Sequence, residues 1–324
     1  MSLTNFPYGI TSMGIPVVGS GTIPASFGDY YFVDSDNGSD ANNGKSLKKA
    51  FATVQKALDT VVTNHNDVIC LSGYSYHTLA AMLTVSKSRV HFVGLDGASR
   101  KYGQGARIQL PVTTAATDIA VMKNTGVRNS FTNIKFDNEN TLAQSLSVVA
   151  EGGEYAEYRN CEMYRGTLLN GATSCELLLN GDSAQFYNCT IGSLADLVVG
   201  DVIHPCVRLA ANQVGAGLVT RDVSFYGTHF WRRAGGTTTA FVYWAAATDV
   251  QRLLYFEDCM FINAINASAT PAAAVTGAAA LTVGACILKD CGSQGNTVMA
   301  AAGKTIYVLG SVPTFATTGV AVTT

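Results

Sequence analysis

The sequence predicts an all-β protein, a right-handed, single-stranded parallel β-helix, and three observations support this prediction. Short segments of one pattern recur every 20 to 36 residues along the chain, which indicates a solenoid. Within each segment apolar and polar residues alternate with a period of two, which is typical of strands. An asparagine or aspartate returns at a fixed place, and these residues tolerate the left-handed backbone that a sharp corner requires.

The repeat is clearest between residues 131 and 261, where each segment reads bulky, polar, Asn or Asp, small apolar, polar, large apolar. The corner positions recur every 27 to 36 residues: Asn133, Asn160, Asn188, Asp222 and Asp258. Upstream, residues 67–71 and 89–93 fit the same pattern, with Val68 aligned to Val90. Equivalent residues of stacked coils lie about 4.8 Å apart. The small apolar position is therefore expected to form one internal column: Ile134, Cys161, Cys189, Val223 and Cys259.

The chain has eight cysteines and no C-x-x-C pair, so neither a zinc module nor a secreted disulfide scaffold is indicated. Their place in the column predicts reduced core residues. Stacked Cα atoms fall within disulfide range, so spacing leaves a bridge open, but parallel Cβ vectors disfavour one.

The composition excludes several functions. A net charge of −2 and only 14% charged residues imply no basic surface for nucleic acid or anionic lipid. Residues 1–28 contain no Lys or Arg, so the positive region of a signal peptide is missing. The one long charge-free stretch that could suggest a membrane span, residues 269–288, is rich in Ala and is interrupted by Pro271, Gly277 and Gly284. We expect no membrane span.

Four regions are predicted. Residues 1–28 form an extended apolar arm, 29–66 an opening turn and capping helix, 67–263 the coils, and 264–324 Ala/Thr/Gly-rich strands that contact other copies. The helix is expected over residues 48–62, with Ser46 as its N-cap, and would plug the first coil. Residues 264–324 carry only Lys289, Asp290 and Lys304 as charges, which suits close contact between identical chains.

The arm has no charged side chain, and an apolar arm needs a surface to lie on. It either packs along its own β-helix or binds a neighbouring subunit. The candidate partner-binding residues are its large apolar side chains: Phe6, Tyr8, Ile10, Met13, Ile15, Val17, Val18 and Ile23.

A metal site is not favoured by the sequence. Asp34, Asp36, Gly38 and Asp40 imitate a calcium loop, but Lys45 stands where the closing Glu would be. An Asx-rich turn is the better interpretation, and we expect no metal and no cofactor.

Catalytic carboxylates are not favoured either. A glycoside hydrolase needs two carboxyl groups roughly 5–9.5 Å apart, and a pectate lyase needs acidic calcium ligands with a basic proton acceptor. No acids recur on neighbouring coils; Glu151, Glu154 and Glu157 flank a Gly-Gly turn and are expected to be solvated. Glu257 and Asp258 also cluster, but Asp258 occupies the repeated corner, and turn roles are expected for Asp182, Asp196 and Asp201. We predict no catalytic residue.

An aromatic segment could bind sugar faces. Trp231 is followed by Arg232 and Arg233 and lies near Tyr226 and His229. The favoured interpretation is an aromatic stack at a coil edge with two solvated arginines.

Residues 31–44 (YFVDSDNGSDANNG) followed by residues 51–59 (FATVQKALD) resemble the start of pectate-lyase-like right-handed β-helix domains, which occur in many phage virion proteins and polysaccharide-acting proteins. The opening NFPYGITSMGIPV is similar to β-helix proteins of tailed phages encoded with head proteins. This fold hosts many functions, so the resemblance bears on fold more than on chemistry.

The resemblance implies a virion protein, made in the bacterial host cytoplasm. The leading hypothesis is a non-enzymatic, homotrimeric decoration (cement) protein on the capsid surface, whose partner is the major capsid protein of the same phage. The alternative is a tail spike or fibre that binds or cleaves host polysaccharide. Spikes usually carry a separate head-binding domain, and this chain has room only for roughly eight coils and a cap. A free polysaccharide lyase or hydrolase is a third hypothesis, disfavoured by the missing acid pair.

Overall fold

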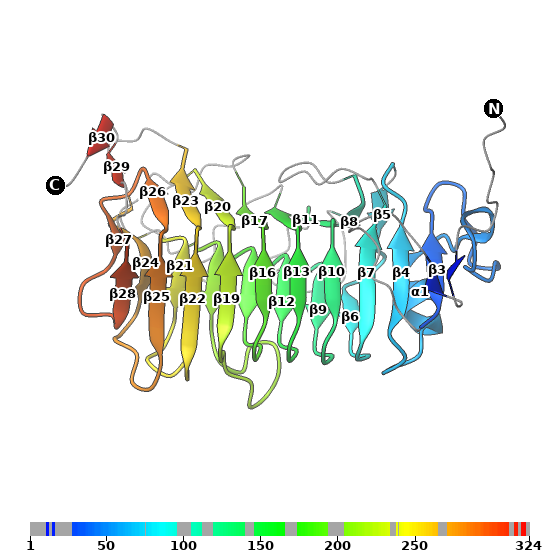
Figure 1. Ribbon diagram of the computed structural model, residues 1–324, viewed down its shortest axis with the longest axis horizontal. Coiled ribbons are helices and arrows are strands. Elements are labelled where there is room, and N and C mark those ends of the chain that lie inside the picture. Colours follow the sequence, from blue (N-terminus) through cyan, green and yellow to red (C-terminus); the bar gives the residue numbers. More distant parts are fainter. Residues whose placement is uncertain are drawn as a thin grey trace.

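The computed structural model describes residues 28–74, 76–95, 105–111, 119–139, 146–165, 174–193, 204–233, 238, 240–264 and 271–310, and the backbone of four short strand segments, 11–12, 15–16, 314–316 and 319–321. The described chain winds as a right-handed parallel β-helix of three sheets, with the first coils at one end and the last at the other (Figure 1). None of its helices is long and apolar enough to span a bilayer.

Sheet 1 contains β3 (Tyr30–Val33), β4 (Asp67–Leu71), β7 (Val90–Gly94), β10 (Ser130–Thr132), β13 (Glu157–Arg159), β16 (Gln185–Tyr187), β19 (Val223–Tyr226), β22 (Leu253–Glu257), β25 (Ala285–Lys289) and β28 (Ile306–Leu309). Sheet 2 contains β5 (Tyr76–Thr78), β8 (Arg107–Leu110), β11 (Lys135–Asn138), β14 (Glu162–Arg165), β17 (Thr190–Gly192), β20 (His229–Arg232), β23 (Met260–Asn263), β26 (Gly292–Gln294), β29 (Thr314–Ala316) and β30 (Gly319–Ala321). Sheet 3 contains β6 (Leu83–Val85), β9 (Met122–Asn124), β12 (Val149–Glu151), β15 (Leu177–Leu179), β18 (Val207–Leu209), β21 (Val242–Trp244), β24 (Ala273–Gly277) and β27 (Val298–Ala300).

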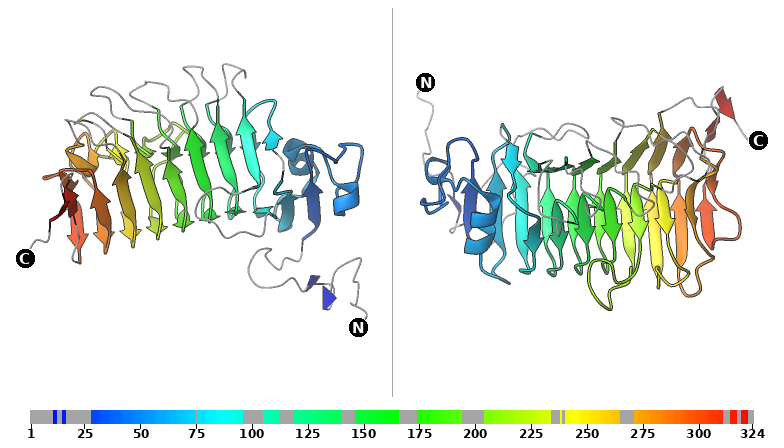
Figure 2. Two further views of the ribbon diagram at one scale, coloured as in Figure 1. Left: turned by 90° about the horizontal axis from the view of Figure 1, so that it is seen from above. Right: turned by 180° about the vertical axis from the view of Figure 1, so that it is seen from behind.

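Each complete coil contributes one strand to each sheet in the order sheet 1, sheet 2, sheet 3 (Figure 2). The pairing between coils is parallel throughout the sheets except at the last strand, where β30 runs antiparallel to β29. Near the N-terminus, β1 (Thr11–Ser12) and β2 (Ile15–Pro16) form a separate antiparallel pair.

Aromatic rings stack inside the coil along sheet 1. The register aligns Phe131 with Tyr158, and Phe186 with Phe225. Adjacent ring centroids from Phe92 to Phe256 lie 4.6–5.1 Å apart. Large apolar residues at one strand position therefore fill the same interior site in successive coils, which is why the sequence repeats there.

From β10 onward, each described corner between sheets 1 and 2 contains a left-handed residue. Asn133, Asn160, Asn188 and Asp258 all have φ between 50° and 56°, as predicted. The prediction was wrong for Asp222, because Phe225 and not Thr220 aligns with Phe186. Gly227 therefore holds this corner, with φ 56°. A glycine serves there because it has no Cβ to oppose a left-handed backbone.

Asp222 lies in a different corner, the one between sheets 3 and 1, and its φ of 46° is also left-handed. The upstream alignment was likewise shifted by one residue, since Asp67 and not Val68 pairs with Val90. A one-residue slip reverses which side chains face the core, so the pairing had to be read from the structure.

The internal column after the corner is confirmed for the cysteines and corrected for Val223. Val223 is buried in β19, but the residue after the corner in that coil is Thr228. Cys291, which the sequence alignment omitted, extends the column by one coil. All eight cysteines are free and buried.

The column also has a hydrogen-bonding role. The Sγ of Cys189 donates to the carbonyl oxygens of Tyr158 and Tyr187, at 3.6 and 3.5 Å. The Oγ1 of Thr228 donates to the equivalent carbonyl oxygens, of Phe186 and Tyr226, at 3.5 and 3.3 Å. A small side chain with a donor fits this site, which explains why Thr can replace Cys.

The capping helix is shorter than predicted. A 3-10 turn, η1 (Leu47–Lys49), precedes α1 (Val54–Thr60), and Thr53 rather than Ser46 caps α1 by accepting a hydrogen bond from the Lys56 N–H. The apolar face of α1 is buried in the same core as Tyr31 and Ile69. The helix therefore covers the first coil, as the sequence led us to expect.

Candidate functional site

The calcium-like loop is built as a turn. The carboxylate of Asp34 accepts hydrogen bonds from the Asp36 and Asn37 N–H groups, both at 3.1 Å, and from the Tyr74 hydroxyl. The carboxylate of Asp40 accepts from the N–H groups of Ala52 and Thr53, both at 2.9 Å. These oxygens are occupied by donors of the chain itself, so the predicted Asx-rich turn is confirmed.

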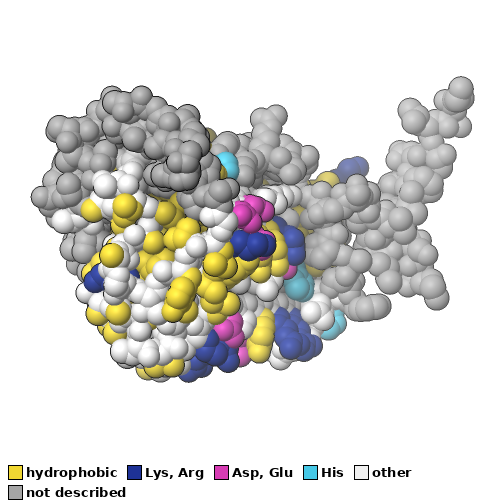
Figure 3. Space-filling model, turned by 60° about the vertical axis from the view of Figure 1, so that its left-hand side comes forward, with side chains coloured by type: hydrophobic (Ala, Val, Ile, Leu, Met, Phe, Trp, Pro, Cys, Tyr) yellow, Lys and Arg dark blue, Asp and Glu magenta, His cyan; other side chains and the backbone are white. Residues whose placement is uncertain are grey.

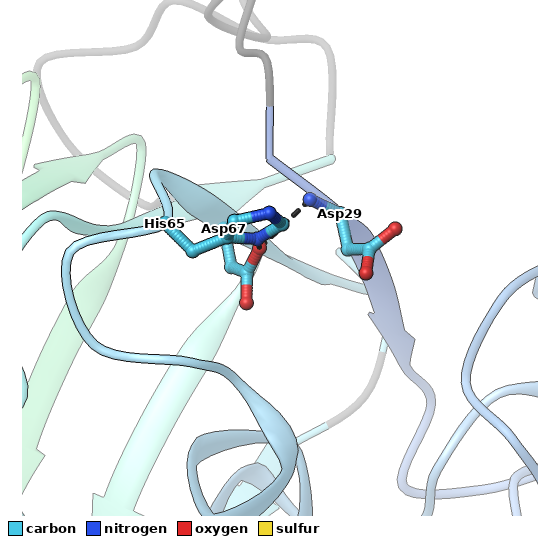
Figure 4. Close-up of side chains that lie close together, drawn as sticks. All are labelled: Asp29, His65 and Asp67. Carbon is cyan, nitrogen blue, oxygen red and sulfur yellow. Dashed lines mark hydrogen bonds and ion pairs between the residues drawn. The ribbon is translucent and has the colours of Figure 1, made fainter.

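A second group of possible metal ligands, Asp29, His65 and Asp67, lies where the arm joins the β-helix (Figure 4). The buried Asp67 carboxylate accepts from the N–H groups of Asp29 and Val62, both at 2.7 Å, and lies 2.6 Å from the His65 Nδ1. The Asp29 carboxylate points away from this pair and lies 3.0 Å from the Lys45 Nζ.

Burial opposes ionisation of Asp67, but the hydrogen bonds from Val62, Asp29 and His65 outweigh it and lower the pKa of its carboxyl group. Because the N–H groups of Asp29 and Val62 already bind the Asp67 carboxylate, this carboxylate holds the two segments together as a structural clamp. We refer to Asp29, Val62, His65 and Asp67 as the N-terminal clamp.

Glu151 is not in a solvated turn, and this prediction was wrong. Its side chain is fully buried and accepts hydrogen bonds from Asn124 Nδ2, at 2.9 and 3.0 Å, from the Gly153 N–H, at 2.6 Å, and from the Tyr158 hydroxyl. Burial raises the pKa of Glu151 to about 7, partly offset by these donors. The correct strand register would have indicated that Glu151 is buried, because Glu151 pairs with Asn124 at a position of sheet 3 that faces the core. Glu154 and Tyr155, which follow, are exposed.

Arg232 was expected in solvent and is instead buried. It makes two hydrogen bonds to the buried Glu176, Nη1 to Oε1 at 2.8 Å and Nη2 to Oε2 at 2.5 Å. His204 lies in the same interior region, and burial, then Arg232 and Arg165, hold its pKa well below its usual range. A buried arginine held by a carboxylate in two places stiffens the interior and is not presented to a ligand.

The aromatic residues considered as an alternative sugar platform are divided between two sheets, which agrees with the favoured interpretation of an aromatic stack. Tyr226 belongs to sheet 1, where its ring stacks on Tyr187 with centroids 5.0 Å apart. His229 and Trp231 belong to β20 of sheet 2. They are neighbours in the sequence because only two residues separate Tyr226 from His229, but the corner at Gly227 turns the chain between them.

Other carboxylates of the described chain are held by cations. On sheet 2, Arg107 pairs with Asp137 and Lys135 lies 3.1 Å from Glu162. Burial raises the pKa of Asp137 to about 7, and Arg107 opposes this shift. Asp182 pairs with Arg221 and Arg252, and Glu257 with Lys289. Asp196 and Asp201 lie outside the described residues.

The outer face of sheet 3 is covered in its middle by a loop of the same chain. Val214 of the turn that follows β18 packs on Gly152 and belongs to a small apolar cluster with Ala150 and Leu178. Asn180 anchors this turn by donating from its Nδ2 to the Ala210 carbonyl at 2.5 Å and accepting the Val214 N–H at 3.3 Å.

The C-terminal end exposes residues of the core pattern. Val308 continues the interior column of Phe256 and Leu288, which are fully buried, yet Val308 is 41% exposed. Tyr307 and Leu309 on the same strand are 55% and 49% exposed. Hydrophobic side chains gather over this end (Figure 3). The last strands, β29 and β30, continue sheet 2 and do not pair with β28 or β27.

The exposed apolar residues of this end are defined here as the C-terminal end surface: Val298, Tyr307, Val308 and Leu309. Of the arm residues predicted to bind a partner, Ile15 lies in β2, and its side chain and the other seven residues lie outside the described part of the chain.

Comparison with known proteins supports the fold. No protein-family model and no curated protein matches the sequence. Among solved structures, a pectin methylesterase from Aspergillus niger is similar over 91% of this chain and 88% of its own, with a TM-score of 0.54 and 14% identity. The pectate lyase Pel9A is similar over 83% and 64%, with a TM-score of 0.57 and 15% identity. A rhamnogalacturonan lyase is similar over 82% and 68%, with a TM-score of 0.54 and 14% identity. At these identities the likeness shows the parallel β-helix fold.

Proposed function

We propose that this protein is a non-enzymatic structural component of a tailed-phage virion, a homotrimer that decorates the capsid. The observation that carries the proposal is the C-terminal end surface, where the core column ends in Val308, which is 41% exposed. Such an end is stabilised when another apolar surface covers it, and solenoids require a cap at each terminus.

The partner that best fits the C-terminal end surface is a second copy of this chain. Residues 264–324 carry three charged side chains, so identical chains can approach closely without burying unpaired charges. Among the described strands, β28 forms the edge of sheet 1, so its outer side offers a row of backbone groups to another strand.

The carboxylates support a structural role over a catalytic one. Glu151 is bound on all sides within the core, Glu176 is held by Arg232, and Asp137 is paired with Arg107. Each contributes to holding coils together, whereas a glycosidase needs two carboxyl groups that are free to act on one bond. The two carboxylates that share a surface pocket, Glu157 and Asp222, are instead paired with Arg159 and Arg252.

Self-association is tested by measuring the mass of the native assembly in solution. We expect the full chain to be a trimer, and Val308→Asp to shift it to monomer by placing a charge in the contact. Leu47→Asp is the matched control, because Leu47 is also exposed, at 63%, but lies at the opposite end in η1. A full chain that is monomeric at every concentration, or a trimer unaffected by Val308→Asp, would contradict the proposed contact.

Capsid binding by the arm is tested by removing residues 1–27, which keeps Asp29 and therefore the N-terminal clamp. We expect the shortened chain to fold and to form the trimer, but to decorate capsids much more weakly, because the arm's apolar contacts add over three chains. Decoration equal to that of the full chain would show that the arm only packs on its own β-helix.

A tail spike acting on host polysaccharide is the second candidate, since the solved structures of this fold include pectin-acting enzymes. Reproducible turnover of host polysaccharide that is lost on one Asp or Glu substitution would favour it over the structural role.

A further inference from the structure

A pocket of about 370 Å³, lined by both apolar and polar atoms, lies on the outer side of sheet 1, at its corner with sheet 3. It is lined by Tyr155, Ala156, Glu157, Ser183, Gln185 and Asp222. The β13–β16 and β16–β19 registers place Tyr155, Ser183 and Asp222 at one corner position in three successive coils. Their φ values of 55°, 56° and 46° put three non-glycine residues in the left-handed conformation, so their side chains repeat along one edge of the pocket.

The pocket presents more hydrogen-bond acceptors than donors. Ser183 donates its hydroxyl hydrogen to Asp182 at 2.8 Å and keeps its oxygen as an acceptor. Gln185 accepts the Tyr187 hydroxyl at 2.7 Å, and its amide nitrogen is the donor that remains. The carboxylates of Glu157 and Asp222 add further acceptor positions.

The charges at the pocket are balanced by neighbours. Arg159 donates to both oxygens of Glu157, at 2.5 and 2.8 Å. Arg252 lies 2.7 Å from one oxygen of Asp222. The arginines hold the two carboxylates in place and neutralise them, which disfavours a cationic ligand.

Tyr155 adds an apolar face. Its ring is 53% exposed, and the Arg128 guanidinium lies over it, 5.5 Å from the centroid. A ligand that donates several hydroxyl groups, carries no charge and has an apolar face matches these three properties together, and a sugar ring has them. The pocket volume lies at the small end of the usual range of about 300–1,000 Å³, which suits one sugar unit.

We propose that this pocket binds one pyranose unit of a neutral glycan, a function beyond the structural role proposed above. Hydroxyl groups of the sugar donate to Ser183, Glu157 and Asp222, and Gln185 donates to a ring or hydroxyl oxygen. A uronic acid is disfavoured, because Arg159 and Arg252 are already paired with Glu157 and Asp222 and are not available to a further carboxylate.

The test begins with an array of neutral hexose, N-acetylhexosamine and uronic acid oligosaccharides, followed by calorimetry with the best neutral binder. We expect Tyr155→Asn and Gln185→Leu each to weaken binding by about ten-fold or more. Asparagine is chosen at position 155 because it tolerates the left-handed backbone and removes the ring.

Arg89→Asn is the matched control. Arg89 occupies the same corner two coils earlier, with φ 55°, and does not line the pocket. It should bind the glycan like the unmodified chain, and all three variants should keep their melting temperature and native mass. Any one of four results would overturn the proposal. These are no binding of a neutral glycan, binding of uronic acids alone, binding of the cation spermidine alone, and unchanged affinity in both pocket variants.

Discussion

The two ends of the β-helix differ in how the apolar core is covered. At the first coil, α1 covers the core with Val54, Ala57 and Leu58, and the N-terminal clamp fixes the chain on either side of the helix. At the last coil, Val308 and its neighbours continue the core pattern into solvent. One end is closed by a helix of its own chain, and at the other end the last described strand of sheet 1 leaves residues of the core pattern exposed, so the same apolar pattern is covered differently at the two ends.

The largest expected effect lies at the closed end. Leu58→Ala removes a side chain that is 3% exposed and leaves a cavity between α1 and the first coil. We expect a loss of about 2–5 kcal/mol in the free energy of unfolding, measured by urea denaturation. A loss below about 1 kcal/mol would mean that α1 contributes little to closing the coil.

Glu151, between the two ends, gives the next largest effect. Burial raises the pKa of Glu151 from 4.5 to about 7, so the folded protein binds this proton more tightly than the unfolded chain. Stability is therefore greatest below pH 4.5 for this group and falls as the pH rises towards 7, by up to about 3 kcal/mol. Glu151→Gln should flatten this part of the curve of unfolding free energy against pH. Glu154→Gln, at an exposed position, should leave the curve unchanged.

Cys189 provides an interior site to compare with the two ends of the β-helix, because a coil packs on each side of it. Cys189→Phe overfills the column and is expected to cost about 1–3 kcal/mol in thermal or urea unfolding. Cys189→Thr should cost less, because Thr228 already occupies the equivalent site and donates to the equivalent carbonyl oxygens. Equal costs for the two changes would contradict the hydrogen-bonding role of the column.

The smallest effect is expected at the open end. Leu309→Ala is the same substitution as Leu58→Ala, but Leu309 is 49% exposed. At protein concentrations where the chain is monomeric it should change the unfolding free energy by less than about 0.5 kcal/mol. At higher concentrations it should weaken association, which sedimentation can measure. A large loss in the monomer would mean that the open end is packed as tightly as the closed end.

Much of the fold could be predicted from the residues of single coils. Asn133, Asn160 and Asn188 marked the corners, because few residues accept a left-handed backbone. The alignment failed at Val223, where the coil contains the extra turn around Val214 that covers sheet 3. The segment around Asp222, at the start of β19, matched the repeat pattern as well as the true corner at Gly227 does. Only the strand pairing distinguishes the two.

The candidate sites were less accessible from sequence. Residues along one edge of the proposed sugar pocket, Tyr155, Ser183 and Asp222, come from corners of three coils, and their alignment depends on the register across those coils. Glu151 next to two glycines resembled a turn, yet its position in sheet 3 turns it inward. Arg232 meets Glu176 through the interior of the coil, a contact that no local pattern contains.

By itself, the sequence determined the period, the strands, the corner residues, the buried cysteines and the apolar character of both ends, because each depends on the conformational preference or hydrophobicity of residues near one another in the chain. The tertiary structure decided which residue of each coil lies above which, and so which carboxylates are buried, which are paired and where the C-terminal end surface and the pocket lie. The physical reason is that a parallel coil brings residues from neighbouring turns of the chain into contact at a register fixed by hydrogen bonds across the whole sheet.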